Sequence, residues 1–199
     1  TMVTHLGISG SFSEKELVPD AIRNSDYYYM EGYLVTSDSA RTAAVKRKEI
    51  ASAAGARTAI SLSDPNMVTY FRDGLMEMIG AGVDLVFANE AEAKGMANTD
   101  ELTEALDFLK RISREFAVTL GPRGALIYDG SELIEIAPVK VEAVNTVGAG
   151  DMFAGAFLYG ITQGWSHKLA GDLAAAGAAK LVASLGPRIR PEESKAVLR

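Results

Sequence analysis

Apolar positions along the chain follow two spacings, one typical of strands and one typical of helices. Short runs rich in aromatic and β-branched residues predict strands at residues 26–35, 57–62, 83–88, 116–120, 125–128 and 133–136. Helical apolar spacing predicts helices at residues 37–54, 67–79, 101–114, 150–163 and 166–184. Residues 1–7 also have the pattern of a strand. Strands that alternate with helices in this way predict a mostly parallel sheet covered on both faces.

Length and composition limit the classes of protein to consider. The 199 residues, 48% of them hydrophobic, are enough for a single domain with a sizeable core. No apolar run approaches the roughly 18 residues of a membrane span. A net charge of −6 argues against broad nucleic-acid binding. The absence of cysteine excludes disulfides and thiolate–metal sites and fits a cytoplasmic protein. His5 and His167 are far apart in sequence and are not favoured as metal ligands or as a catalytic base.

The most informative segment is residues 145–155, N-T-V-G-A-G-D-M-F-A-G. Two glycines precede Asp151, which opens a predicted helix. A helix N-terminus attracts anions, and glycines let phosphate oxygens approach the backbone. Ala156 stands where a Walker A loop needs lysine, and Phe153 stands where a dinucleotide fingerprint needs its third glycine. A phosphate-binding turn is therefore one interpretation. The other is a tight strand-to-helix turn in which Asp151 only complements the helix dipole.

Two further segments combine turn chemistry with groups that bind phosphate or metal. Residues 119–124, T-L-G-P-R-G, lie between two predicted strands and taken alone indicate a β-turn. Residues 89–92, N-E-A-E, follow a predicted strand, and Asn89 and Glu92 have the spacing of a capping box. All three segments leave a strand, which is where ligands bind in parallel α/β sheets. We expect the three to converge on one cleft.

Together the three motifs resemble those of ribokinase-like (PfkB) sugar and nucleoside kinases, which carry N-x-x-E, T-x-G-x-x-G and D-T-x-G-A-G-D in this order. The chain departs at Asn145, which stands in place of the first Asp. Residues 29–34, 61–65 and 83–90 look more like the adenosine-kinase branch than ribokinase or fructokinase. The resemblance implies a ribokinase-like three-layer α/β/α fold with a mostly parallel central sheet.

The resemblance covers nearly the whole chain, but only the later two-thirds of such a kinase. We therefore interpret residues 1–199 as a single partial kinase domain that carries the ATP site and the catalytic base. On this interpretation the N-terminal substrate and lid part is absent, and the sheet is incomplete at its N-terminal side.

The resemblance also implies an activity and its residues. The γ-phosphoryl of Mg·ATP would move to a primary hydroxyl of a nucleoside, and the 5′-hydroxyl of adenosine is the expected acceptor. Asp151 would be the catalytic base, beside the charge-stabilising backbone of Gly148, Ala149 and Gly150. The nucleotide site would be formed by Asn89, Thr119, Gly121, Gly124 and Thr146. Glu92 would organise Mg²⁺ through water. Asn145 lacks the charge of the Asp associated with a monovalent cation, which puts potassium activation in question.

Two alternatives stay open at this point. One is a sugar kinase of the same family, similar to ribokinase or fructokinase. The other is a non-catalytic, nucleotide-binding regulatory module, against which Asp151 argues because a pure binding protein has no need of that carboxylate. The expected partners are a small nucleoside or sugar and the missing N-terminal segment, without nucleic acid or membrane, and a homodimer is compatible with the sequence.

Overall fold

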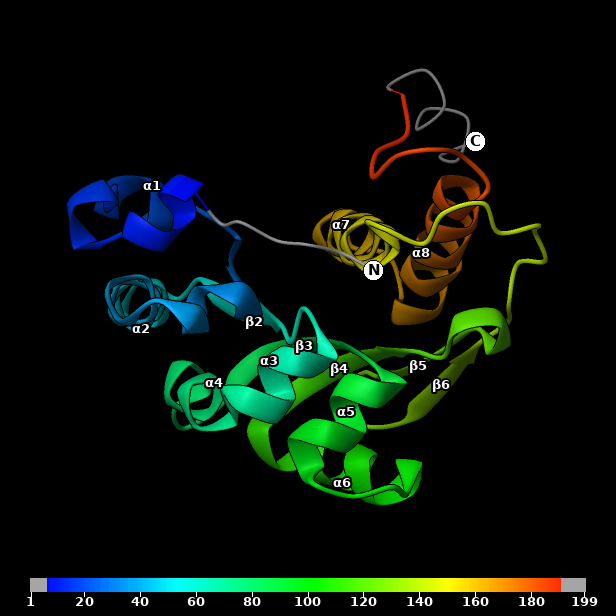
Figure 1. Ribbon diagram of the computed structural model, residues 1–199, viewed down its shortest axis with the longest axis horizontal. Coiled ribbons are helices and arrows are strands. Elements are labelled where there is room, and N and C mark those ends of the chain that lie inside the picture. Colours follow the sequence, from blue (N-terminus) through cyan, green and yellow to red (C-terminus); the bar gives the residue numbers. More distant parts are fainter. Residues whose placement is uncertain (1–6, 191–199) are drawn as a thin grey trace. The chain divides into compact units, whose positions relative to one another are not determined.

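The computed structural model describes residues 7–190, in which strands and helices alternate (Figure 1). The strands are β1 Tyr27–Glu31, β2 Arg57–Ser61, β3 Val83–Asn89, β4 Ser113–Thr119, β5 Ala125–Tyr128 and β6 Leu133–Ile136. The α-helices are α1 Pro19–Arg23, α2 Asp38–Ala54, α3 Pro65–Tyr70, α4 Arg72–Ile79, α5 Glu90–Ala97, α6 Leu102–Ile112, α7 Ala149–Thr162 and α8 His167–Val182. Short 3-10 helices are η1 Gly7–Ser11, η2 Glu14–Glu16, η3 Gly32–Thr36 and η4 Gly121–Arg123. The strand predicted at the N-terminus lies outside the described residues, apart from Gly7.

The described strands form one open sheet in the order β1-β2-β3-β4-β5-β6. β1 and β2 are parallel, with Met30 opposite Ile60, and α2 provides the connection that a parallel pair needs. β4, β5 and β6 are antiparallel neighbours joined by short turns. In the turn between β5 and β6, the N–H groups of Ser131 and Glu132 donate to Asp129 Oδ1, each at 2.8 Å. The chain therefore reverses direction without a crossover helix.

By their internal contacts, the described residues divide into two compact units. The first takes in the described residues up to Val86 and then Ala91–Arg114, and the second takes in Phe87–Glu90 and the described residues from Glu115 onward. The three boundaries fall inside β3, α5 and β4, and not in a linker. The single domain expected from the sequence stays a prediction.

In the first unit, α2 lies against β1, β2 and α4. The Ser37 side chain caps its start by accepting a hydrogen bond from the Ala40 N–H, and Gly55 ends it with a left-handed φ of +81°. Its buried face consists of small side chains, which let the helix approach its neighbours closely; they are Ala40, Ala43, Ala44 and Ala51.

In the second unit, α7 and α8 lie side by side (Figure 1). Small residues allow this approach, since a Cβ added to Gly160 would stand 2.7 Å from the Ala170 Cβ. A Cβ added to Gly171 would meet the side chains of Ile127 and Ile136 at 2.5 and 2.6 Å. The small residues of α8 therefore bring it directly onto β5 and β6.

Three differences between the predicted and observed elements are informative. The strand expected at 26–35 ends at Glu31, and η3 follows. Gly32 turns the chain there: its N–H donates to Ser63 Oγ at 2.8 Å, and a Cβ would stand 2.7 Å from the Ser61 carbonyl oxygen. The helix expected at 67–79 is two helices, α3 and α4, separated at Phe71 with φ −127° and ψ 23°.

The third difference concerns the helix expected at 101–114. It ends at Ile112, and Ser113 has extended backbone angles and begins β4. The Ser113 N–H and the Ser113 hydroxyl both donate to the Leu109 carbonyl, the hydroxyl at 2.8 Å. The helix therefore ends two residues earlier than the apolar spacing predicts.

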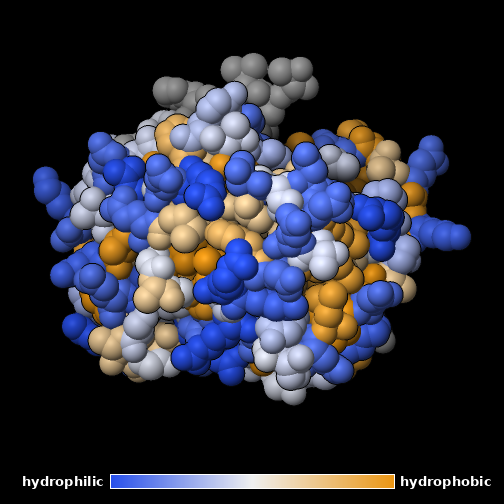
Figure 2. Space-filling model, turned by 90° about the horizontal axis from the view of Figure 1, so that it is seen from below, coloured by the Kyte–Doolittle hydropathy of each residue, from blue (hydrophilic) through white to orange (hydrophobic). Residues whose placement is uncertain are grey.

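The surface is mixed in character. Figure 2 shows one face on which hydrophilic residues (blue) break up the apolar ones (orange). Within residues 7–190, no helix combines the length and the apolar character that crossing a bilayer requires.

Candidate active site

The turn between β4 and β5 has a shape that only glycine permits at its last position. The Leu120 N–H donates to the Gly124 carbonyl at 2.8 Å and closes the turn. Gly124 has a φ of +90°, and a Cβ there would meet the backbone that follows β6, with Pro138 N at 3.0 Å. Gly121 has a φ of +60° and nothing within 4 Å of its Cβ position. The backbone at Gly121 is therefore accessible to a ligand.

The turn before α7 is attached to the end of α8. The N–H groups of Val144 and Asn145 donate to the Val182 carbonyl at 2.7 and 3.1 Å. Asn145 Oδ1 accepts a hydrogen bond from the Val147 N–H at 2.9 Å. Gly148 then adopts a φ of +83°, and α7 begins at Ala149. Asn145, the one departure from the family's motif, thus uses its amide oxygen to shape this turn.

These two turns line one cavity of about 520 Å³, which we call the turn cavity. Thr119, Gly121 and Gly124 line it from the first turn, and Thr146, Ala149 and Gly150 from the second. Small and apolar side chains cover most of the remaining wall; they include Val139, Val141, Phe153, Ala175, Ala178, Ala179 and Val182. Two of the three sequence motifs therefore meet at one cavity, as expected, and the alanine-rich α8 forms its wall.

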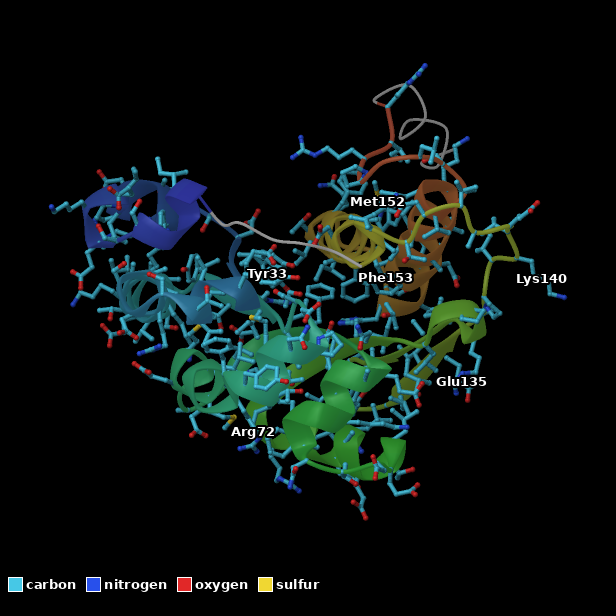
Figure 3. The ribbon with its side chains drawn as sticks, in the orientation of Figure 1. Tyr33, Arg72, Glu135, Lys140, Met152 and Phe153 are labelled. Carbon is cyan, nitrogen blue, oxygen red and sulfur yellow. The ribbon has the colours of Figure 1, made fainter. Side chains whose placement is uncertain are left out.

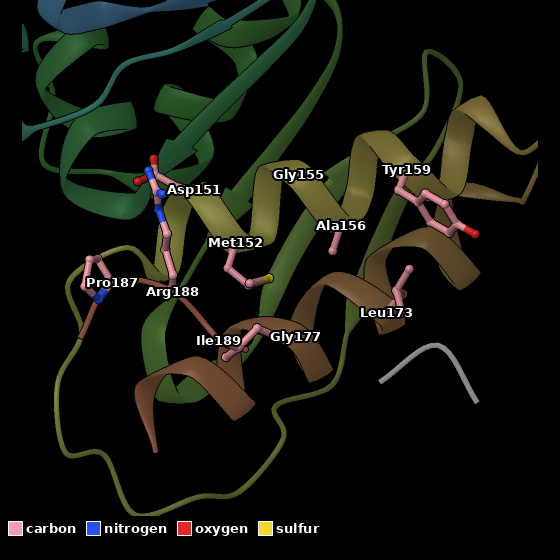
Figure 4. A pocket seen from close by; sticks show the side chains of 10 residues that line it. All are labelled: Asp151, Met152, Gly155, Ala156, Tyr159, Leu173, Gly177, Pro187, Arg188 and Ile189. Atoms are coloured by element: carbon pink, nitrogen blue, oxygen red, sulfur yellow. The ribbon is translucent and has the colours of Figure 1, made fainter. Parts of the chain in front are cut away.

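Asp151 lies in a second pocket, also of about 520 Å³, which we call the α7–α8 groove (Figure 4). Figure 3 shows that Met152 and Phe153 leave α7 on different sides; Met152 lines the groove and Phe153 lines the turn cavity. At one end of the groove, the side chains of Asp151 and Arg188 point toward one another (Figure 4). Ala149 and Gly150 in the first turn of α7 therefore line the turn cavity, whereas Asp151 in the same turn lines the α7–α8 groove.

The third motif lines neither of these two pockets. Asn89 is the last residue of β3, and α5 starts at Glu90, so Asn89 has the position that a helix cap requires. Glu90 forms an ion pair with Arg123 of the β4–β5 turn. Glu92 is buried, with 5% of its surface exposed. The expectation that all three motifs converge on one cleft therefore holds in the structure for two of them, and the roles of Asn89 and Glu92 stay predictions.

The arrangement of the acidic residues limits the ways in which a metal ion could be bound. Within residues 7–190, no three His, Cys, Asp or Glu side chains gather into a group that could bind a metal ion. Mg²⁺ commonly keeps several waters and binds through one or two carboxylates together with substrate phosphates. The residues present fit a Mg²⁺ ion that arrives on a nucleotide, and they do not fit an ion held by protein ligands alone.

Sequence reasoning missed the place of Arg188 and the pairing of Arg123 with Glu90. Asp151 and Arg188 are separated by all of α7 and α8, and their proximity depends on the path of the chain after α8. No spacing in the sequence signals it. The wall of the turn cavity had a signal in the alanines of α8, which suit a sheet or a flat ligand.

The model of the pfkB family of carbohydrate kinases matches residues 1–194. A ribokinase from Lactococcus lactis is 41% identical over 91 residues, which is 46% of this chain and 29% of the relative. The solved adenosine kinase from Sinorhizobium meliloti is 32% identical with a TM-score of 0.90, over 95% of this chain and 58% of that one. A structure from E. coli in complex with ATP and Mg²⁺ is 23% identical with a TM-score of 0.84, over 95% of this chain and 63% of that one.

These likenesses confirm the ribokinase-like α/β fold with its mostly parallel sheet, and the similarity to the adenosine-kinase branch. The E. coli structure, at its low identity, shows the fold alone. The chain spans about a third of the Lactococcus relative and little more than half of the Sinorhizobium kinase. Activity, substrates and partners of the whole protein are therefore matters for proposal.

Proposed function

The chain belongs to the pfkB family of carbohydrate kinases, and we propose that it carries the nucleotide site and catalytic base of an ATP-dependent kinase for a nucleoside, adenosine in the first place. The observation that carries this proposal is the turn cavity, at which the 119–124 and 145–151 segments meet beside the start of α7. Its volume of about 520 Å³ lies within the usual range for a small-molecule site.

The lining of the cavity suits the parts of ATP. Flat, small side chains of α8 suit a purine ring, and the open glycines suit phosphates. Both Ala149 and Gly150 belong to the first turn of α7, where backbone N–H groups lack partners within the helix and attract anions. The Ala149 N–H donates to the Thr146 carbonyl at 3.2 Å, so Gly150 is the donor that we assign to the phosphates. A Cβ added to Gly150 would have nothing within 4 Å, so its backbone can be approached closely. We place the triphosphate at residues 148–150.

Transfer would then proceed in line. The acceptor oxygen bonds to the γ-phosphorus while the bond from that phosphorus to the β,γ-bridging oxygen breaks, and ADP leaves. Asp151 takes the proton of the acceptor hydroxyl. The N–H group of Gly150 and the dipole of α7 stabilise the charge that develops on the phosphoryl group. Mg²⁺ carried by the phosphates would neutralise their charge, and Glu92 is the residue proposed to hold one of its waters.

The acceptor is proposed to be a nucleoside because, by sequence, the adenosine kinase of Schizophyllum commune aligns with 82% of this chain, whereas the Lactococcus ribokinase aligns with 46% of it. The test is turnover of the full-length protein with Mg·ATP against adenosine, other nucleosides, ribose and fructose, with the product identified by mass spectrometry. The highest kcat/KM with adenosine supports the proposal. Preference for ribose or fructose makes the protein a sugar kinase, and ATP binding without any turnover makes it a regulatory module.

Potassium is proposed to have little effect. The oxygen of Asn145 carries no full charge and already accepts the Val147 N–H. Rates measured in potassium chloride and in tetramethylammonium chloride should agree within about twofold, and a larger activation by potassium would contradict this part of the proposal.

A further inference from the structure

Arg188 reaches the proposed catalytic base from a segment that the sequence motifs do not include. It follows α8, and its side chain points toward the Asp151 carboxylate at one end of the α7–α8 groove (Figure 4). Both side chains are exposed. Since exposed charges of opposite sign add little to stability, the placement of Arg188 at this end of the groove is poorly explained as a device that holds the fold together.

The backbone of this segment is positioned by close contact with the turn before α7. Gly186 turns the chain after α8 with a φ of +99°. A Cβ added to Gly148 would stand 2.6 Å from the Pro187 carbonyl oxygen, so Pro187 lies directly on the anion-binding turn. Arg188, the next residue, is therefore presented beside the first turn of α7 by backbone packing.

The charges in the groove are confined to this end. Apart from Asp151 and Arg188, its described lining is uncharged: Met152, Gly155, Ala156, Tyr159, Leu173, Gly177, Pro187 and Ile189. One carboxylate and one guanidinium thus stand together where the proposed transfer takes place. A guanidinium has five N–H donors in a planar fork and can hold a carboxylate and a phosphoryl oxygen at the same time.

We propose that Arg188 is a further catalytic residue, whose guanidinium binds the oxygens of the transferring phosphoryl group while Asp151 takes the acceptor's proton. The inference rests on the proposed function. Arg188 and Asp151 line the same end of the groove. When the γ-phosphoryl arrives, its oxygens accept hydrogen bonds from the same fork, and the bonds strengthen as charge spreads over those oxygens in the transition state.

The test compares R188Q, R188K and R188A with R190Q in the full-length protein. Arg190 is exposed, belongs to the same segment and does not line the groove. R188Q should lower kcat by about 10²–10³-fold, as loss of one transition-state donor does, with KM for ATP changed less than about threefold. R188K should retain part of the rate. R190Q should keep the wild-type kcat.

Two readouts separate catalysis from a structural role. Guanidinium ion added at millimolar concentration should raise the rate of R188A and leave R190Q unchanged. ADP with aluminium fluoride and acceptor, a mimic of the transferring phosphoryl, should bind R188Q at least about tenfold more weakly than wild type, whereas ADP alone binds both equally.

The possible failures are distinguishable. A wild-type protein that phosphorylates no acceptor defeats the proposed function and, with it, this inference. An active wild type whose R188Q variant keeps its rate defeats the inference about Arg188 alone. An R188Q variant that binds ADP as weakly as it binds the mimic, without rescue of R188A, would show that Arg188 only supports the turn.

Discussion

Arg123, in the turn between β4 and β5, forms an ion pair with Glu90, the residue that directly follows β3. The Arg123 side chain is 60% exposed and that of Glu90 is 25% exposed. Pairs with this degree of exposure contribute about 0–1 kcal/mol to stability. The pair instead connects the segment that contains Asn89 with the turn that lines the turn cavity, so its expected effect is on nucleotide binding.

A double-mutant cycle tests this connection. E90Q and R123Q should each raise KM for ATP by about two- to fivefold, while the free energy of unfolding falls by less than about 1 kcal/mol. The KM of the double variant should be no higher than that of the more impaired single variant, because either change alone breaks the pair. K168Q, which breaks the exposed Lys168–Asp172 pair on α8, is the control and should leave KM unchanged. Fully additive effects of E90Q and R123Q would contradict the coupling.

Gly148 and Gly155 differ in what a methyl group would meet, and this predicts opposite effects on stability. Gly148 has a φ of +83°, and its Cβ would collide with the Pro187 carbonyl. G148A should lower the free energy of unfolding by about 2 kcal/mol or more, from left-handed strain together with the collision. Gly155 lies inside α7 with open space around its Cβ position, so G155A should raise that free energy by about 0.5–1 kcal/mol. Urea unfolding of both variants measures the difference, and equal effects would refute it.

Local signals in the sequence were enough to predict most of the secondary structure. The glycines before Asp151 and the apolar spacing after it predicted that a helix starts at Gly150, and α7 starts one residue earlier, at Ala149. At the end of β1, a contact from elsewhere in the chain explains why the prediction failed. The aromatic run of β1 continues past Gly32 in the sequence, but the structure turns there because the end of β2 lies against Gly32.

The candidate site was predictable to the extent that it depends on local motifs. The two glycine turns contain the residues that shape them, and the alternation of strands and helices predicts that such turns lie at one edge of a sheet. The pairing of Arg123 with Glu90 and the approach of Arg188 to Asp151 depend on loop paths and are not encoded in any spacing.

Tyr28 predicts a specific loss of stability at high pH. Burial raises the pKa of the Tyr28 phenol from 10.0 to about 12, partly offset by Arg47. Because the folded-state pKa lies above the unfolded value, Tyr28 contributes no pH dependence below pH 10, and stability falls as the pH rises from about 10 toward 12. At pH 11.5 this shift corresponds to a loss of about 2 kcal/mol.

Unfolding of wild type and Y28F by urea between pH 9 and pH 11.5 isolates this contribution. The difference in unfolding free energy between the two should be constant near pH 9 and should shift in favour of Y28F by about 2 kcal/mol at pH 11.5. Y70F is the matched control, because Tyr70 is 75% exposed. A difference between wild type and Y28F that does not change with pH would show that burial of the phenol is not linked to its ionisation.

Gly150 tests whether the turn cavity binds phosphate. Since the space around its Cβ position is empty, G150V should fold with a change in unfolding free energy below about 1 kcal/mol. The branched side chain would occupy the approach to the backbone N–H groups and should weaken ATP binding at least about tenfold. Isothermal titration calorimetry with ATP measures this, with G155A as the control. Unchanged ATP affinity in a folded G150V variant would place the phosphates elsewhere.

Asp151 is the residue on which the proposed chemistry depends most directly. In the full-length protein, D151N should lower kcat by about 10²–10⁴-fold, because asparagine keeps the size of the side chain but cannot take the proton of the acceptor hydroxyl. ATP binding should stay within about threefold of wild type, since the phosphate-binding groups are backbone N–H groups that the change leaves in place. D172N, at an exposed carboxylate of α8, is the control and should keep the wild-type rate.

The D151N variant also distinguishes a catalytic base from a residue that only stabilises the start of α7. An aspartate in the first turn of a helix stabilises it by about 0.3–1 kcal/mol, so a purely structural Asp151 would show that loss in urea unfolding together with a kcat close to wild type. A catalytic Asp151 shows the same small loss of stability with a large loss of kcat. Because kcat and unfolding free energy are measured on the same sample, a D151N protein that turns over at the wild-type rate would remove Asp151 from the mechanism and leave α7 as an anion-binding helix alone.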